Sequence, residues 1–147
     1  MRIRELSTDE CIEFLSRTAL GHLGCARAGQ PYVVPVHFSC DAERNCLYGF
    51  SGIGQKIAWM RDNPQVCVEV ADIADKDRWT TVLVFGRYEE VEDDADTRQR
   101  VWDRLRDRRE WWLPAAAKAG SREPHAAMIY RIQIDRLTGR SASRDRA

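Results

Sequence analysis

The chain lacks a long hydrophobic run and an excess of charge of either sign. No apolar stretch reaches the roughly 18 to 20 residues that a membrane-spanning helix needs, and the N-terminal sequence MRIRELSTDE is polar. The sequence therefore predicts neither a membrane span nor a secretory signal. Lys and Arg together number 23, as do Asp and Glu, so the net charge is zero. This balance argues against a nucleic-acid partner, and we expect a cytoplasmic protein.

Metal-ligand and disulfide patterns are also missing. The five cysteines include no Cys-x-x-Cys spacing and lie in mostly apolar settings, which favours buried, reduced thiols. His22 with Cys25, and His37 with Cys40, are each three residues apart. On a strand this spacing puts the two side chains on opposite faces, so neither pair can share an ion. We expect no metal site.

What the sequence does contain is a glycine-containing loop that leads into an amphipathic helix. The segment 32–56 is typical of a strand, a polar turn, a second strand and then this loop. The first N–H groups of a helix have no intrahelical partner and carry partial positive charge, which stabilises an anion. Ser51, Gln55 and Lys56 add a hydroxyl, an amide and a cation. The pattern predicts a phosphate site.

Other interpretations of the loop are open at this point. Gly49 and Gly54 have the glycine spacing of the G-x-x-x-x-G-K-[ST] loop of nucleotide hydrolases, but Gln55 stands where the lysine should be. An ordinary glycine turn before a helix is the plain alternative. Ile53, Ile57 and Met60 follow helical spacing, which predicts that they anchor the helix to the core.

The ordered motifs from position 30 to position 67 resemble a known family. The stretches QPYVVPVHF, LYGFS, GQK and NPQVC are similar to the pyridoxamine 5'-phosphate oxidase-like FMN-binding split-barrel superfamily, and within it to the nitroimidazole-resistance-type branch. The resemblance extends from about Ser7 to about Leu137. It implies a mainly β fold with peripheral helices, a six-stranded split β-barrel. It also implies a homodimer with FMN bound between the subunits.

The resemblance further implies a set of cofactor-binding residues. They are Val34, Pro35, Val36, His37, Phe50, Ser51, Gly52, Gln55, Lys56, Trp79 and Thr81. The strand 34–37 would lie along the isoalloxazine ring, and the segment 50–56 would hold the ribityl phosphate. Phe50 stands where the nitroimidazole-resistance branch usually has a histidine, so this side chain can stack or pack but cannot carry protons. No catalytic residue is predicted.

Two positions keep a structural alternative. Pro35 has no N–H, which suits a place where a ligand meets the backbone, but an ordinary edge strand would explain it equally well. A lone histidine such as His37 is more often a satisfied structural residue than a catalyst.

The functional hypothesis is an FMN-dependent oxidoreductase that passes electrons from a reduced nicotinamide to a small oxidised acceptor. Because the cofactor itself carries out such redox chemistry, the absence of a recognisable nucleophile or acid–base pair is no obstacle. The alternatives are a flavin storage or sensor protein without turnover, a split barrel that takes F420 or haem, and a purely structural dimer.

The remaining pattern predicts one domain over residues 1–138 and a flexible tail over 139–147. Ser7 and Glu10 form a capping box for a helix that ends near Arg17. Strands are expected at 21–27, 32–40, 46–50, 66–70, 79–91 and 126–137, with a charged connection over 72–78 and a bulge at Gly86. A charged helix is expected over 92–112. Its end carries Trp111 and Trp112, which would serve core packing, a subunit interface or a lid over the flavin.

Overall fold

The computed structural model describes residues 1–92, 94–106 and 128–144. Within these residues, eight antiparallel strands form one sheet, and three helices lie against it. The elements are β1 (Arg2–Glu5), α1 (Thr8–Arg17), β2 (Leu20–Arg27), β3 (Gln30–His37), β4 (Ser39–Asp41), β5 (Cys46–Ser51), α2 (Gln55–Asp62), β6 (Gln65–Asp75), β7 (Arg78–Glu90), α3 (Ala95–Arg106) and β8 (Met128–Ser143).

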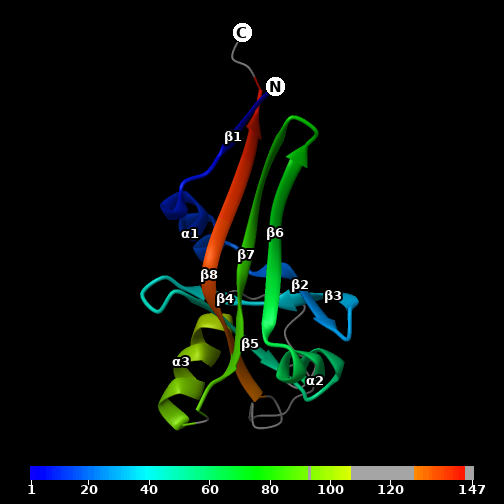
Figure 1. Ribbon diagram of the computed structural model, residues 1–147. Coiled ribbons are helices and arrows are strands. Elements are labelled where there is room, and N and C mark those ends of the chain that lie inside the picture. Colours follow the sequence, from blue (N-terminus) through cyan, green and yellow to red (C-terminus); the bar gives the residue numbers. More distant parts are fainter. Residues whose placement is uncertain (93, 107–127, 145–147) are drawn as a thin grey trace.

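The sheet has a barrel-like end and a projecting end. Its strand order is β3-β2-β6-β7-β8-β5-β4, with β1 paired to the far side of β8, and the path does not close on itself. Figure 1 shows β6, β7 and β8 running side by side past the shorter strands toward the two chain termini. We call this projection, formed by residues 2–5, 71–75, 78–82 and 138–143, the sheet arm. The mainly β fold with peripheral helices is as predicted.

The first helix forms as the sequence predicts. The Ser7 hydroxyl accepts a hydrogen bond from the Glu10 N–H at 3.2 Å, and the Glu10 carboxylate accepts one from the Ser7 N–H at 2.8 Å. This capping box satisfies two N–H groups at the helix start. Phe14 and Leu15 are buried, and the helix ends at Arg17.

The prediction of six strands is too low, because β1 has no hydrophobic pattern and the second predicted strand is divided. All four residues of β1 are exposed, so only its pairing with β8 reveals it as a strand. The predicted strand 32–40 divides into β3 and β4 at Phe38, whose N–H donates to the Ala19 carbonyl at 2.9 Å instead of continuing a ladder.

The prediction of a flexible tail from residue 139 is wrong for residues 139–143. These residues continue β8, where Gly139 lies opposite Val82 of β7 and Arg140 lies opposite both Glu5 of β1 and Thr81 of β7. Pairing on two sides satisfies the backbone although the Arg140 side chain remains exposed.

The β6–β7 hairpin is longer than predicted, and its bulge is where the sequence placed it. Strand β6 continues to Asp75, so the predicted charged connection shrinks to a turn in which Asp75 binds Arg78 at 2.9 Å and Arg144 at 3.0 Å. The ladder between β7 and β8 shifts register between Phe85 and Gly86, which confirms the predicted bulge. A Cβ atom at Gly86 would lie 2.3 Å from a backbone oxygen, so glycine is required.

Two hydrophobic clusters fix the helices. The larger cluster lies under α1 and α2 and includes Leu15, Ile57 and Met60. The smaller lies under α3 and includes Phe50, Val101 and Leu105. The described part of the predicted 92–112 helix is α3, whereas Trp111 and Trp112 lie outside the described residues. Among the helices of the described residues, none combines the length and apolar character of a membrane span.

Candidate functional site

The predicted phosphate loop ends at a helix start that carries no side-chain cap. Gly54 is the N-cap residue of α2, so no N-cap side chain accepts a hydrogen bond from the first N–H groups of the helix. The first turn of this fully described helix also contains no acidic residue. A Cβ atom at Gly52 or Gly54 would meet nothing within 4 Å, so the backbone faces open space. The N–H groups at the helix start therefore remain accessible to an anion.

Lys56 is the cation of this loop, and it has no acidic partner in the described part of the chain. The side chain is partly buried in the first turn of α2, and this burial lowers its pKa. Ion pairs are present elsewhere on the surface, but none that the described residues form involves Lys56. A partly desolvated ammonium without a carboxylate is stabilised by an anionic ligand.

The other loop residues take different positions. Ser51 is buried, and its hydroxyl donates to the Gly52 carbonyl at 2.7 Å. Ile53 is 73% exposed, so the predicted anchoring of this residue is wrong: α2 begins only at Gln55, and helical spacing does not apply to the loop before it. Ile57 and Met60 are buried as predicted.

The side chain of Phe50 packs under α3. It is 5% exposed, and its ring lies edge-on to Trp102 with 5.6 Å between the ring centroids. In this position it fills the smaller cluster together with Val101 and Leu105. The replacement of the usual histidine is therefore accommodated as core packing.

Strand β3 alternates as predicted. Val34 and Val36 belong to the side that packs on the core, whereas Pro35 is exposed on the opposite side. β3 ends the strand order of the sheet and pairs with β2, so Pro35 does occupy an edge strand. His37 is buried at the end of this strand. We call the side of the sheet that faces away from the core, where Pro35 lies, the outer face.

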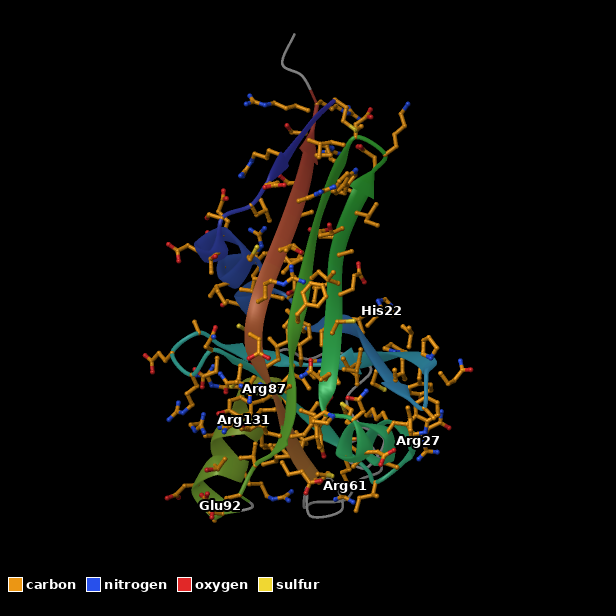
Figure 2. All side chains as sticks on the ribbon, viewed as in Figure 1. His22, Arg27, Arg61, Arg87, Glu92 and Arg131 are labelled. Carbon is orange, nitrogen blue, oxygen red and sulfur yellow. The ribbon has the colours of Figure 1, made fainter. Side chains whose placement is uncertain are left out.

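A cross-strand row of residues on the outer face contains a His–Glu pair that the sequence did not reveal. Pro35, His22, Glu69, Leu83 and Thr138 are successive register partners across five strands. Nδ1 of His22 lies 3.2 Å from Oε2 of Glu69. Figure 2 shows His22 beside β6. The two residues are far apart in sequence, so only the register brings them together.

Trp79 and Thr81 lie on the sheet arm, far from the loop of the same chain. The separation between the loop and Thr81 can be counted along strand β8, because Ser51 lies opposite Met128 and Thr81 lies opposite Arg140. These twelve residues of strand (140 − 128) correspond to about 40 Å. The structure thus brings β3 and the loop together at one end and leaves Trp79 and Thr81 at the other. One chain alone does not assemble all of the predicted site.

The antiparallel, unclosed sheet with α2 at its barrel-like end defines a split-barrel architecture. The family model described as pyridoxamine 5'-phosphate oxidase matches residues 7–141. The match covers most of the chain, and the protein belongs to this family.

Individual relatives agree with this assignment. An uncharacterized protein of Rhizobium meliloti (strain 1021) is 35% identical over 148 residues, which cover 97% of each chain. The crystal structure of a FAD-binding protein from Mesorhizobium loti is 40% identical, with a TM-score of 0.80, and the match covers 97% of this chain and 100% of that one. A structure from Bacteroides thetaiotaomicron, provisionally assigned as a 5-nitroimidazole antibiotic resistance protein, shares the fold at 17% identity, with a TM-score of 0.69 over 96% of this chain and 89% of that one.

Proposed function

We propose that two copies of this chain bind FMN between them and pass electrons from a reduced nicotinamide to a small oxidised acceptor. The observation that carries the proposal is Lys56, a partly buried cation without a described acidic partner at an uncapped helix start. The similarity to a FAD-binding protein at 40% identity supports a flavin. Both flavins carry a phosphate on the ribityl chain, which is the group that this loop fits.

The residues present fit such a cofactor at two points. The N–H groups at the start of α2 and the ammonium of Lys56 would hold the phosphate. The exposed backbone edge of β3 around Pro35 would lie along the ring, where the missing proline N–H requires no strand partner. The flavin, when bound, supplies the hydride and electron chemistry, and the protein supplies binding and orientation.

A second copy of the chain would bring Trp79 and Thr81 to the flavin. Because about 40 Å of strand separates Thr81 from the loop, Trp79 and Thr81 would reach the flavin held by the partner subunit's loop. The sheet arm has an apolar row suited to such a contact. Ile73, Trp79, Ala142 and Ile3 are successive register partners, and Ile73 and Ile3 are 69% and 51% exposed.

The His22–Glu69 pair gives the proposed site a group that can hold a proton. The carboxylate of Glu69 orients the imidazole through Nδ1, which leaves Nε2 for exchange on the face where Pro35 lies.

Titration with FMN and FAD tests the loop assignment. A charge-assisted contact to phosphate contributes about 1.5–3 kcal/mol, so we expect Lys56→Ala to weaken FMN binding roughly ten- to hundred-fold with the fold retained. Lys76→Ala, on the exposed β6–β7 turn, is the matched control and should bind FMN like the wild type. Equal FMN affinity of the two variants would show that Lys56 does not bind the phosphate. Tighter binding of FAD than of FMN would identify FAD as the cofactor and would leave the assignment of the loop unchanged.

Turnover and subunit sharing need separate measurements. Anaerobic bleaching of bound flavin by NADH or NADPH separates an oxidoreductase from a storage or sensor protein, and uptake of F420 or haem instead of flavin would overturn the cofactor assignment.

Mixing Lys56→Ala with Trp79→Ala chains tests the shared site. If both residues serve one flavin from different subunits, random pairing restores about a quarter of the sites, whereas neither variant alone binds normally. No recovery would contradict the shared site.

A further inference from the structure

A groove of about 620 Å³ crosses the outer face and includes none of the residues predicted to bind the flavin. Its middle is a second cross-strand row, in which Val33, Gly24, Cys67, Phe85 and Arg136 are successive register partners from β3 to β8. Its volume lies in the range of small-molecule sites, which is about 300–1,000 Å³.

The floor of the groove is flat and apolar. Gly24 has no side chain there, and a Cβ atom at this position would approach the sulfur of Cys67 to 2.8 Å. Val33 is 67% exposed at one side, and the ring of Phe85 is partly exposed at the other. A shallow surface of this composition suits the face of a planar ring system, which it can contact without a deep cavity.

One end of the groove carries a positive charge that the described residues do not neutralise. The Arg136 guanidinium lies 4.2 Å from the centroid of the Phe85 ring, is exposed, and forms no ion pair with a residue that the structure describes. The neighbouring acid, Asp135, is bound by Arg87 at 3.1 Å. Figure 2 shows Arg87 at the lower part of β7. This contact holds the Arg136 guanidinium over the Phe85 ring and leaves its N–H groups for an anion.

We propose that this groove binds a flat organic anion, such as an aromatic carboxylate, with its ring on Val33, Cys67 and Phe85 and its carboxylate on Arg136. The charge of Arg136 favours an anion over a neutral or cationic ligand. The groove adjoins the strand proposed to line the flavin ring, since Val33 directly precedes the segment 34–37. Its use as the acceptor site rests on the proposed function, whereas binding of the anion does not.

The probe is 2-naphthoate, with neutral 2-naphthamide as its matched control, titrated calorimetrically into the full chain with and without FMN. We expect Arg136→Gln to weaken naphthoate binding about ten- to hundred-fold and to leave naphthamide binding unchanged. Arg140→Gln is the matched control variant, because Arg140 is an exposed arginine on the same strand and face that does not line the groove. It should bind naphthoate like the wild type.

Three results would overturn the proposal. They are equal naphthoate affinity of the wild type and Arg136→Gln, displacement of naphthoate by FMN, and binding that disappears as the chain dimerises, which would make a second copy the occupant. A wild-type protein that binds naphthoate but not FMN would instead refute the proposed function, and the groove would still be an anion-binding site. Titration of the wild type with FMN and with naphthoate, each in the absence of the other, therefore distinguishes the two failures.

Discussion

Asp41 and Lys56 are both buried to some degree, yet one is surrounded by opposite charge and the other is not. The Asp41 side chain is 1% exposed, and its Oδ2 atom lies 3.2, 3.4 and 3.7 Å from Arg44, Arg100 and Arg104. Burial by itself favours the neutral carboxyl, but the Arg44 N–H and the side chains of Arg104 and Arg44 hold the Asp41 pKa below its ordinary value. Lys56 has burial without such compensation.

The difference separates charge that stabilises the fold from charge that is available to a ligand. Arg100 and Arg104 belong to α3, whereas Asp41 belongs to β4, so this cluster attaches the helix to the sheet. Lys56 attaches nothing among the described residues, and its partial desolvation is a cost to folding that an anion would offset. We expect substitutions at Asp41 to change stability and substitutions at Lys56 to change binding.

The largest effect is expected for Asp41→Asn. Removing one member of a fully buried ion pair costs about 3–5 kcal/mol, and because these arginines are one third to one half exposed we expect about 2–3 kcal/mol. Urea unfolding measures the loss, with Glu43→Gln on the exposed neighbouring turn as the control. A free energy of unfolding equal to that of the control would show that the cluster does not stabilise α3.

A smaller, pH-dependent effect is expected for Glu10→Gln. Hydrogen bonding from Arg4, followed by that from the Ser7 N–H, lowers the Glu10 pKa from 4.5 to about 2. A depressed folded-state pKa contributes stability above the unfolded pKa, and this stability is lost as pH falls through the folded pKa. The urea midpoint of the wild type should therefore exceed that of Glu10→Gln at pH 6, and the difference should shrink between pH 4.5 and pH 2. A constant difference would assign the effect to geometry alone.

The smallest effect on stability is expected for Lys56→Ala. Without a described partner to lose, the variant should change the free energy of unfolding by less than about 0.5 kcal/mol in the absence of ligand. Saturating FMN should raise the melting temperature of the wild type more than that of the variant, because stabilisation by a ligand follows its affinity. Destabilisation of the ligand-free variant comparable to that of Asp41→Asn would erase the contrast between the two regions.

Short sequence patterns correctly predicted those features of the fold that depend on neighbouring residues. The capping box, the alternation in β3 and the bulge at Gly86 each depend on neighbouring residues, and each is present. Strand β1 was missed because its exposed residues carry no periodic signal, and the length of β8 was underestimated for the same reason.

The parts of the candidate site that depend on distant contacts were not predictable. The His22–Glu69 pair arises from strand register, and the burial of Phe50 depends on α3, which is remote in sequence. The resemblance implies that Trp79 and Thr81 bind the flavin, but no local pattern indicates that about 40 Å of strand separates them from the loop.

The bulge beside Gly86 lies between the barrel-like end of the sheet and the sheet arm. From Gly86 to Arg78 the eight residues of β7 extend about 26 Å, so a change in bend of only 10° would displace the tip by about 5 Å. In the proposed dimer such a displacement would withdraw Trp79 from its partner's flavin without altering a single residue that touches it. Alignment of the two subunits would thus depend on a position where no side chain fits.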